Sequence, residues 1–431
     1  MRPSPFELER LMGIEAYLTD TEGIGGRLRA EVGDFAVREV SDVAAGDSGD
    51  YLIVRVEKEN WETHHLLRDM ARRLGISDER IGAAGIKDKR AVTTQLMSIR
   101  GLAADDLGKV TLPRVRITPL GRSNKGIAPG DLKGNEFDIM VKDVCLDAAE
   151  IDSRLAAVTT GIAAAGGVPN FFGYQRFGIK RPVTHLVGEQ IVKGDVEGAA
   201  MTFIARSFPW EKPENQEVRD FVWATRDFGK GLETYPLNLR YERTMMHHLV
   251  VRPGDYKGAF RALPGGLITM FVHAFQSYLF NRIMSRRLIA GKSLSVPDEG
   301  DVVCFTGSGG RPDPAKIELV TAKNLADVRY LQKRRRAFPV LPIVGRDTKP
   351  SMLDETARAV LDAAGVGPES FVIGQIPELT SAGRWREALL PATPEMVAGD
   401  RSVRARFFLP KGSYATTVLR EYMKADPICM S

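Results

Sequence analysis

Cysteine and histidine are scarce in this chain of 431 residues, which contains three cysteines and six histidines. The cysteines, Cys145, Cys304 and Cys429, are far apart and odd in number, so they predict no disulfide framework and indicate a reducing compartment. There is no Cys-x-x-Cys pair, and the adjacent His64 and His65 point in different directions, which makes them a poor metal pair. The sequence therefore predicts no metal site.

Long apolar runs are missing as well. No segment approaches the roughly 20 apolar residues that a membrane helix requires, and the N-terminus has no apolar stretch of the signal-peptide kind. Residues 23–26 (GIGG) begin like a dinucleotide-binding loop, but Leu28 stands where the third glycine belongs. We therefore expect a cytoplasmic protein with no membrane segment and no dinucleotide fold.

The overall composition is that of an ordinary globular protein with a net positive charge. Hydrophobic residues make up 43% of the chain and charged residues 27%, as in soluble proteins. The formal net charge of +5 favours a polyanionic partner without requiring one. The length allows two or more domains with a large core.

Residues 81–95 (IGAAGIKDKRAVTTQ) place one carboxylate, Asp88, among Lys87, Lys89 and Arg90 on a glycine-flanked loop. Nearby cations favour the ionised form of a carboxylate. The alternation that begins after the loop predicts a strand. Two interpretations stay open on this pattern alone: a catalytic carboxylate beside a strand, or a solvated basic turn whose Asp offsets local charge.

Alternating apolar and polar residues in the first third predict three strands, at residues 27–32, 35–40 and 51–57. Phe35, which opens the second of them, either packs in the core or offers a face to a base. An apolar helical pattern follows, with Thr63 as the expected N-cap and Gly75 as the end.

Residues 131–142 predict a further strand in which Asn135, Phe137, Ile139 and Val141 share one face. Three of these side chains are apolar, so the Asn is conspicuous among them. A buried Asn must be hydrogen-bonded, and its partner is either the backbone or a ligand.

The middle of the chain is aromatic and then basic. Residues 168–178 (VPNFFGYQRFG) combine four aromatic residues with Arg176, a composition that suits base stacking and phosphate pairing, and equally suits an interdomain hinge. An amphipathic helix over residues 267–290 has a basic tail, and residues 333–336 (KRRR) are a second basic cluster. The two clusters are either solvated faces or a phosphate-binding surface.

The last segment changes character again. A strand over residues 402–409 and a helix over residues 414–422 are predicted after the helical middle. We therefore expect the end of the chain to return to the sheet of the first third, which makes the middle an insertion.

These pieces, in this order, resemble the TruD family of tRNA pseudouridine synthases. The resemblance rests on five motifs spread over nearly the whole chain, at residues 34–39 (DFAVRE), 85–95 (GIKDKRAVTTQ), 134–137 (GNEF), 170–178 (NFFGYQRFG) and 409–416 (LPKGSYAT). Each motif alone is weak, and together they are highly specific.

The resemblance implies an α+β fold: a pseudouridine synthase catalytic core with a mixed, mostly antiparallel sheet, plus an inserted α/β TRUD domain. The catalytic domain is expected over residues 1–168 and 385–431, and the insertion over residues 169–384. The implied reaction is isomerisation of a uridine, position 13 of the tRNA D-arm in many members, to pseudouridine. The implied partner is tRNA, and neither a metal nor a small-molecule cofactor is required; the oligomeric state is not implied.

The motif match makes Asp88 the catalytic carboxylate. Such a carboxylate must be ionised and held still, which requires a charge-assisted partner. Arg29 matches a position that is usually Lys in the family, so it is the expected supporting cation, with a different reach and fork geometry. Lys87, Lys89 and Arg90 on the same loop are candidate RNA contacts.

The remaining matched positions suit a uracil flipped out of its stack. Phe137 matches the aromatic that lies against the target base, Asn135 a substrate-binding amide, and Phe35 a substrate-contacting aromatic. Tyr414 matches another substrate-binding aromatic, usually Phe. Arg176 is a further candidate RNA contact.

Two other functions compete with this one. A non-catalytic RNA-binding or RNA-folding protein could use the same basic surface. A glycosidase-like hydrolase would need a second carboxylate, and the loop motif contains no obvious one.

Overall fold

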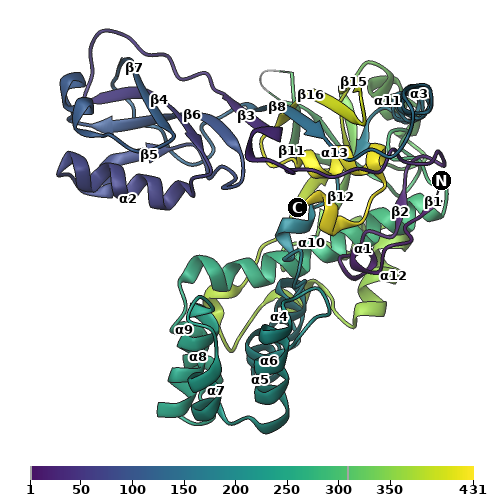
Figure 1. Cartoon of the computed structure of the whole chain (residues 1–431). Helices are drawn as coiled ribbons and strands as arrows, with labels where there is room; N and C mark the ends of the chain where they lie inside the picture. The colour runs from purple at the N-terminus through teal and green to yellow at the C-terminus, as the bar shows by residue number, and fades with distance from the viewer. Residues whose placement is uncertain (1, 308–309) are drawn as a thin grey trace. The chain divides into compact units, whose positions relative to one another are not determined.

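The computed structural model, drawn in Figure 1, describes residues 2–307 and 310–431. The chain divides into two compact units. Unit 1 consists of the chain up to Asp20 together with Ala164–Leu390, and unit 2 consists of Thr21–Ala163 with Pro391–Ser431. The boundaries near 164 and 390 lie close to those of the predicted domains. The N-terminal segment, however, packs within unit 1.

The contacts of the N-terminal segment explain this placement. Glu15 pairs with Arg282 at 2.9 Å, and the hydroxyl of Ser285 donates to the carbonyl of Gly13 at 2.8 Å. Both partners belong to a long helix of unit 1, α10 (Gly265–Ile289). Sequence periodicity does not reveal such long-range contacts.

Unit 2 is built on a sheet with the order β15-β16-β8-β3-β6-β4-β7, with β5 paired to β6. Its strands are β3 (Phe35–Val40), β4 (Tyr51–Glu59), β5 (Ile81–Ala83), β6 (Val92–Arg100), β7 (Val115–Ser123), β8 (Gly134–Val141), β15 (Glu395–Gly399) and β16 (Ser402–Pro410). Only β3 and β6 pair in parallel among these strands. The predicted mixed, mostly antiparallel sheet is confirmed, and β16 returns to it beside β8.

Three helices belong wholly or mostly to unit 2: α2 (Thr63–Leu74), α3 (Ala148–Ala165) and α13 (Ala415–Met423). The predicted helix α2 is confirmed, but its N-cap is Glu62, whose carboxylate accepts from the backbone N–H groups of His64 and His65. Thr63 is the first helical residue instead, and its hydroxyl is used elsewhere. Gly75 ends the helix with a φ of 67°, a conformation that glycine adopts at low cost.

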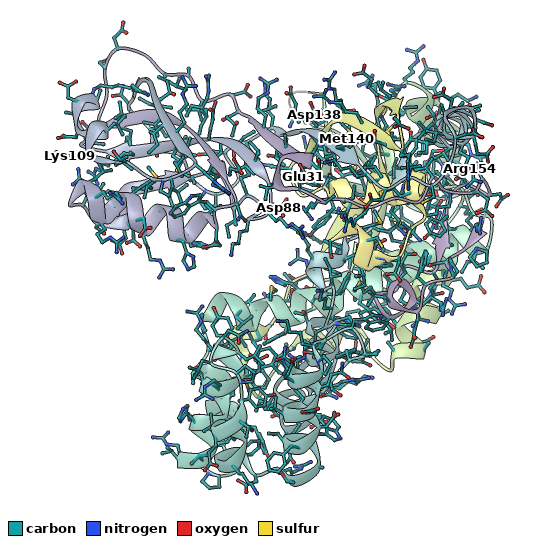
Figure 2. All side chains as sticks on the ribbon, in the orientation of Figure 1. Glu31, Asp88, Lys109, Asp138, Met140 and Arg154 are labelled. Carbon is teal, nitrogen blue, oxygen red and sulfur yellow. The ribbon has the colours of Figure 1, made fainter. Side chains whose placement is uncertain are left out.

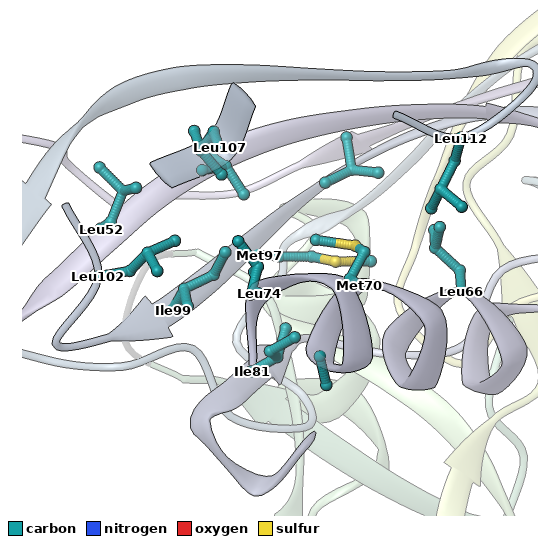
Figure 3. Packing of buried hydrophobic residues seen from close by; sticks show 13 residues of the cluster. Leu52, Leu66, Met70, Leu74, Ile81, Met97, Ile99, Leu102, Leu107 and Leu112 are labelled. Atoms are coloured by element: carbon teal, nitrogen blue, oxygen red, sulfur yellow. The ribbon is translucent and has the colours of Figure 1, made fainter. Parts of the chain in front are cut away.

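Helix α2 covers one face of strands β4 and β6, as Figure 3 shows. Leu66 and Met70 of the helix are fully buried against Val54, Met97 and their neighbours. Burial of each such side chain stabilises the fold by about 1.5–3 kcal/mol. This core supports the end of the sheet from which the loop around Asp88 departs.

The strand predicted over residues 27–32 is wrong. Arg27 forms only an isolated bridge with Lys142, and Arg29 has a φ of 53°, which interrupts an extended chain. Residues Val32–Asp34 form a 3-10 turn in which a carboxylate oxygen of Asp34 accepts from the N–H of Glu31 at 2.7 Å. The alternating pattern here reflects burial of individual side chains rather than a strand.

Unit 1 combines helices with a four-stranded antiparallel sheet of order β11-β10-β12-β13. Its strands are β1 (Arg2–Pro3), β2 (Ala16–Tyr17), β9 (Val168–Pro169), β10 (Val302–Thr306), β11 (Pro312–Leu319), β12 (Ala337–Ile343), β13 (Arg384–Glu387) and β14 (Leu389–Leu390). Its helices, besides α10, are α1 (Glu7–Leu11), α4 (Thr184–Val192), α5 (Val196–Ala205), α6 (Pro213–Thr225), α7 (Phe228–Thr234), α8 (Arg240–Val251), α9 (Tyr256–Arg261), α11 (Leu325–Lys333) and α12 (Glu355–Ala364).

Helix α10 buries the predicted apolar face, including Phe271, Phe275 and Leu279. In the described part of the chain, no helix combines the length and the apolar character needed to cross a membrane.

Candidate active site

The loop between β5 and β6 carries Asp88, which is labelled in Figure 2. Two buried side chains fix its backbone from the α2 side. The hydroxyl of Thr63 accepts from the N–H of Lys87 at 3.1 Å and donates to its carbonyl at 3.3 Å. The ammonium of Lys58 donates to the carbonyl of Asp88 at 3.1 Å and to that of Trp61 at 2.6 Å. The loop is therefore held at the residues on which the position of the carboxylate depends.

Asp88 pairs with Arg29, as predicted from the resemblance to the family. Nη2 of Arg29 lies 3.3 Å from Oδ2 of Asp88, and the side chains are 5% and 33% exposed, respectively. Burial lowers the pKa of the Arg29 guanidinium, and the charge of Asp88 opposes that shift. The buried guanidinium of Arg29 therefore holds the carboxylate of Asp88, which is exposed enough for a ligand to reach.

An aromatic row continues from this ion pair across the sheet. The Arg29 guanidinium lies 3.9 Å from the ring centre of Phe35, and Phe35 meets Phe137 edge to face with ring centres 6.3 Å apart. Phe137 in turn stacks on Phe407 at 5.4 Å. A cation over a desolvated ring is stabilised by about 2 kcal/mol, so Phe35 helps to hold Arg29 in place.

Phe35 is only 1% exposed, which does not agree with its predicted role as a substrate contact. Its ring packs against the Arg29 guanidinium and the Phe137 ring, so its role here is to support the site. Phe137 retains 9% exposure. It is the ring of this row that the prediction assigned to the target base.

Lys87 also differs from its prediction as an RNA contact, because its side chain turns inward and is 6% exposed. Its Nζ lies 2.7 Å from Oε2 of Glu39, whose side chain is fully buried, and it donates to Oδ1 of Asn135 at 2.7 Å. The Asn is therefore hydrogen-bonded to a side chain, an arrangement that the choice between backbone and ligand did not include.

Lys58, Glu39 and Phe407 are parts of this site that sequence reasoning missed. Lys58 follows Val56 at the next inward position of β4, so a lysine on an apolar face was the signal. Burial lowers the pKa of Lys58 to about 8, and the charge of Asp88 opposes this shift. Phe407 stands opposite Phe137 in the register between β16 and β8, which sequence alternation within one strand does not specify.

The other predicted residues are more scattered. Lys89 and Arg90 are exposed on the Asp88 loop, and Arg90 also donates to the carbonyl of Ala30 at 3.4 Å. Tyr414 is half-buried at the N-cap of α13. Arg176 belongs to unit 1, where its guanidinium lies 5.6 Å from the ring centre of Phe172.

Much of the basic tail of α10 is paired with carboxylates of unit 1. Arg282 and Arg286 pair with Glu15, at 2.9 Å and 3.5 Å. Arg287 is 4% exposed and pairs with Asp301 at 2.7 Å. These ion pairs stabilise unit 1 and occupy Arg282 and Arg287 within it, whereas Arg286 and Lys292 remain 50% and 41% exposed. The phosphate-binding interpretation of this cluster stays a prediction.

A groove of about 490 Å³ lies along the same strands, but mainly on the opposite face of the sheet. Most of its lining residues alternate along the strands with those of the aromatic row, namely Ala36, Arg38, Val92, Thr94, Glu136, Asp138, Arg406 and Phe408. The lining also includes Val37, Phe137 and Phe407. Its charges are paired, for example Arg406 with Asp138 at 3.2 Å. The groove therefore differs from the carboxylate site in most of its lining, although the two share Phe137 and Phe407.

Within residues 2–307 and 310–431, no three His, Cys, Asp or Glu side chains are grouped so that they could hold a metal ion. The chemistry available at Asp88 is that of a positioned carboxylate, which can act as a nucleophile or a base toward a planar ligand on the aromatic row.

Comparisons with known proteins agree with the expected family. A model of the family described as tRNA pseudouridine synthase D (TruD) matches residues 11–422. Proteins named probable tRNA pseudouridine synthase D are 48% identical in Methanococcoides burtonii, over 98% of this chain and 99% of the relative, and 47% identical in Methanosarcina mazei, over 99% of each. A crystal structure assigned to the same family from Methanosarcina mazei has a TM-score of 0.86 at 46% identity, and the match covers 98% of this chain and 99% of that one. The chain therefore belongs to the TruD family of tRNA pseudouridine synthases, which are isomerases.

Proposed function

We propose that this protein converts uridine 13 of the tRNA D-arm to pseudouridine, with Asp88 as the catalytic carboxylate. The observation that carries the proposal is the ion pair between Asp88, which is 33% exposed, and Arg29, which is 5% exposed. The buried cation holds the carboxylate in one place, while the partial exposure leaves it open to a base.

The reaction breaks the bond between N1 and C1′, turns the uracil, and joins C5 to C1′. A proton leaves C5 and N1 gains one, so the atoms balance without a cofactor. Asp88 can serve by attacking C1′, by adding to the base, or by removing a sugar proton. Each role requires an ionised carboxylate at a fixed position, and the contacts of Arg29, Thr63 and Lys58 supply that position.

The flipped uracil would rest against Phe137, with Asn135 as a hydrogen-bonding partner at its edge and Tyr414 as a further substrate contact. Packing against Phe35 and Phe407 keeps the Phe137 ring in one orientation. A preorganised ring loses little entropy when a base binds, and stacking on such a ring is worth about 1–3 kcal/mol.

Lys89 and Arg90 are exposed beside Asp88 and suit phosphates next to the flipped nucleotide. Arg176 is a proposed RNA contact in unit 1. At the level of domains, we assign the catalytic pseudouridine synthase core to unit 2 and the inserted TRUD domain to unit 1.

The test is modification of an unmodified tRNA transcript by the purified protein. Pseudouridine has the same mass as uridine, so a pseudouridine-specific chemical adduct read by primer extension is the appropriate assay. We expect one stop, at position 13, and none on a matched transcript with cytidine there. A protein that binds the transcript without producing the stop would instead be an RNA-binding or RNA-folding protein.

A further inference from the structure

The amide of Asn135 is held in one orientation by its neighbour. Nζ of Lys87 donates to Oδ1 of Asn135 at 2.7 Å. An ammonium group has three N–H donors and no acceptor, so Asn135 must turn its carbonyl oxygen toward Lys87. The NH2 group of the amide therefore points away from Lys87.

This orientation is fixed because Lys87 itself cannot move freely. Its ammonium lies 2.7 Å from Oε2 of Glu39, and the two side chains are 6% and 0% exposed. The other oxygen of Glu39 accepts from the N–H of Leu96 at 3.4 Å, and the backbone N–H of Lys87 is held by Thr63. Breaking a buried ion pair leaves an uncompensated charge, so the pair keeps its geometry.

The NH2 group of Asn135 is available to a ligand. Across the part of the chain that the structure describes, neither of its N–H groups donates to a protein acceptor, and the residue is partly exposed. Asn135 also shares its face of β8 with Phe137, two residues along the strand. A planar base on this face would meet hydrogen-bond donors at its edge.

We propose that Lys87 is a positioning residue that makes Asn135 a donor-only contact, and that this contact selects uracil over cytosine. The inference rests on the proposed function. We assign the contact to the carbonyl at C4 of the bound uracil. Cytosine has an amino group at C4, so a donor would face a donor and both would be left without a partner.

The same contact suits the product. Isomerisation exchanges N1 with C5, which amounts to a half-turn of the ring about the axis through N3 and C6. That half-turn also exchanges the carbonyls at C2 and C4. A donor-only amide therefore meets a carbonyl both before and after the turn, whereas an amide free to flip would lose this match.

The experiment measures equilibrium binding of two tRNA transcripts that differ only by uridine or cytidine at position 13. Asp88→Asn protein is used throughout, so that no turnover takes place. The quantity of interest is the dissociation constant of the cytidine transcript divided by that of the uridine transcript. With Asn135 and Lys87 intact, we expect the uridine transcript to bind about 10-fold more tightly.

Two variants change the contact. Asn135→Asp keeps an oxygen toward Lys87 and presents a second oxygen to the base, so the ratio should fall to one or below. The double variant Glu39→Gln/Lys87→Met removes both buried charges together and releases the amide, so the ratio should fall to within about 3-fold of one. Lys89→Met, at an exposed neighbour, should weaken both transcripts alike and keep the ratio.

A ratio near one with Asn135 and Lys87 intact would overturn the inference, because the amide would then not read the C4 position. Unchanged ratios in Asn135→Asp or in the double variant would also overturn it. These failures are distinct from failure of the proposed function. If the wild-type protein neither binds nor modifies the transcript, the proposed function and this inference are both wrong. If the wild-type protein modifies position 13 but the variants leave the ratio of dissociation constants unchanged, only this inference is wrong.

Discussion

Lys58 is a buried cation whose titration should be visible in the stability of the protein. Its side chain is 1% exposed, and burial lowers its pKa from 10.5 to about 8, against the opposing effect of Asp88. Between these two pH values the unfolded chain binds more protons at this position than the folded chain. The free energy of unfolding therefore rises with pH in that window, from about 8 to 10.5.

The magnitude follows from the two pKa values. Their difference corresponds to about 3 kcal/mol when the titration is complete. Between pH 7 and pH 9.5, the linkage relation gives an increase of about 2 kcal/mol. Solvent screening removes little of this, because the ammonium is buried and bonded to the carbonyls of Asp88 and Trp61.

Urea unfolding at pH 7 and pH 9.5 tests this value by comparing the wild-type protein with Lys58→Met. Methionine has a similar length and no charge, so the variant loses the pH-dependent contribution of this position. The wild type should gain about 2 kcal/mol more than the variant over this pH range. Lys89→Met, which changes an exposed lysine of the Asp88 loop, should behave like the wild type. An identical pH response of Lys58→Met and the wild type would refute the reasoning.

Three further outcomes are expected. Arg29→Met should reduce the rate of pseudouridine formation by about 10- to 100-fold, since Asp88 loses a charge-assisted contact of about 1.5–3 kcal/mol; an unchanged rate in single-turnover assays would contradict the supporting role of Arg29. Phe137→Leu keeps an apolar side chain of similar size and should weaken tRNA binding by about 1–3 kcal/mol, measured by filter binding; equal affinity would remove the ring from the base-binding surface. Burial raises the pKa of the Cys304 thiol to about 12, so iodoacetamide at pH 8 should label the exposed Cys145 and leave Cys304 intact in the folded protein; mass spectrometry showing equal labelling would contradict that burial.

Strands and helices with strong periodicity could be predicted from the sequence. The face shared by Asn135, Phe137 and Ile139 lies as predicted on β8, because alternation within one strand is a local property. The return of the last segment to the sheet also followed from pattern, since the alternation at β16 required a partner. Family resemblance supplied the pairing of Asp88 with Arg29, which no local pattern indicates.

The parts of the site that the sequence did not predict depend on contacts between segments that are far apart in the chain. Lys87 looked like a surface cation because three charged residues follow it in the sequence, yet its side chain turns inward to Glu39 and Asn135. Likewise, the sequence pattern at the end of α10 did not reveal that Arg282 and Arg286 pair with Glu15. In each case a carboxylate or amide far away in the sequence determines whether a cation faces solvent or the interior, and composition alone does not contain that information.

The central claim is that Asp88 performs the chemistry while other residues bind and orient the RNA. The most direct measurement compares wild-type and Asp88→Asn protein on the same tRNA transcript, with binding and pseudouridine formation recorded in parallel. Asparagine keeps the size of the side chain and removes its charge. We predict that the variant binds the transcript with an affinity close to that of the wild type and forms no pseudouridine. Pseudouridine formation by the variant at the wild-type rate would contradict the account.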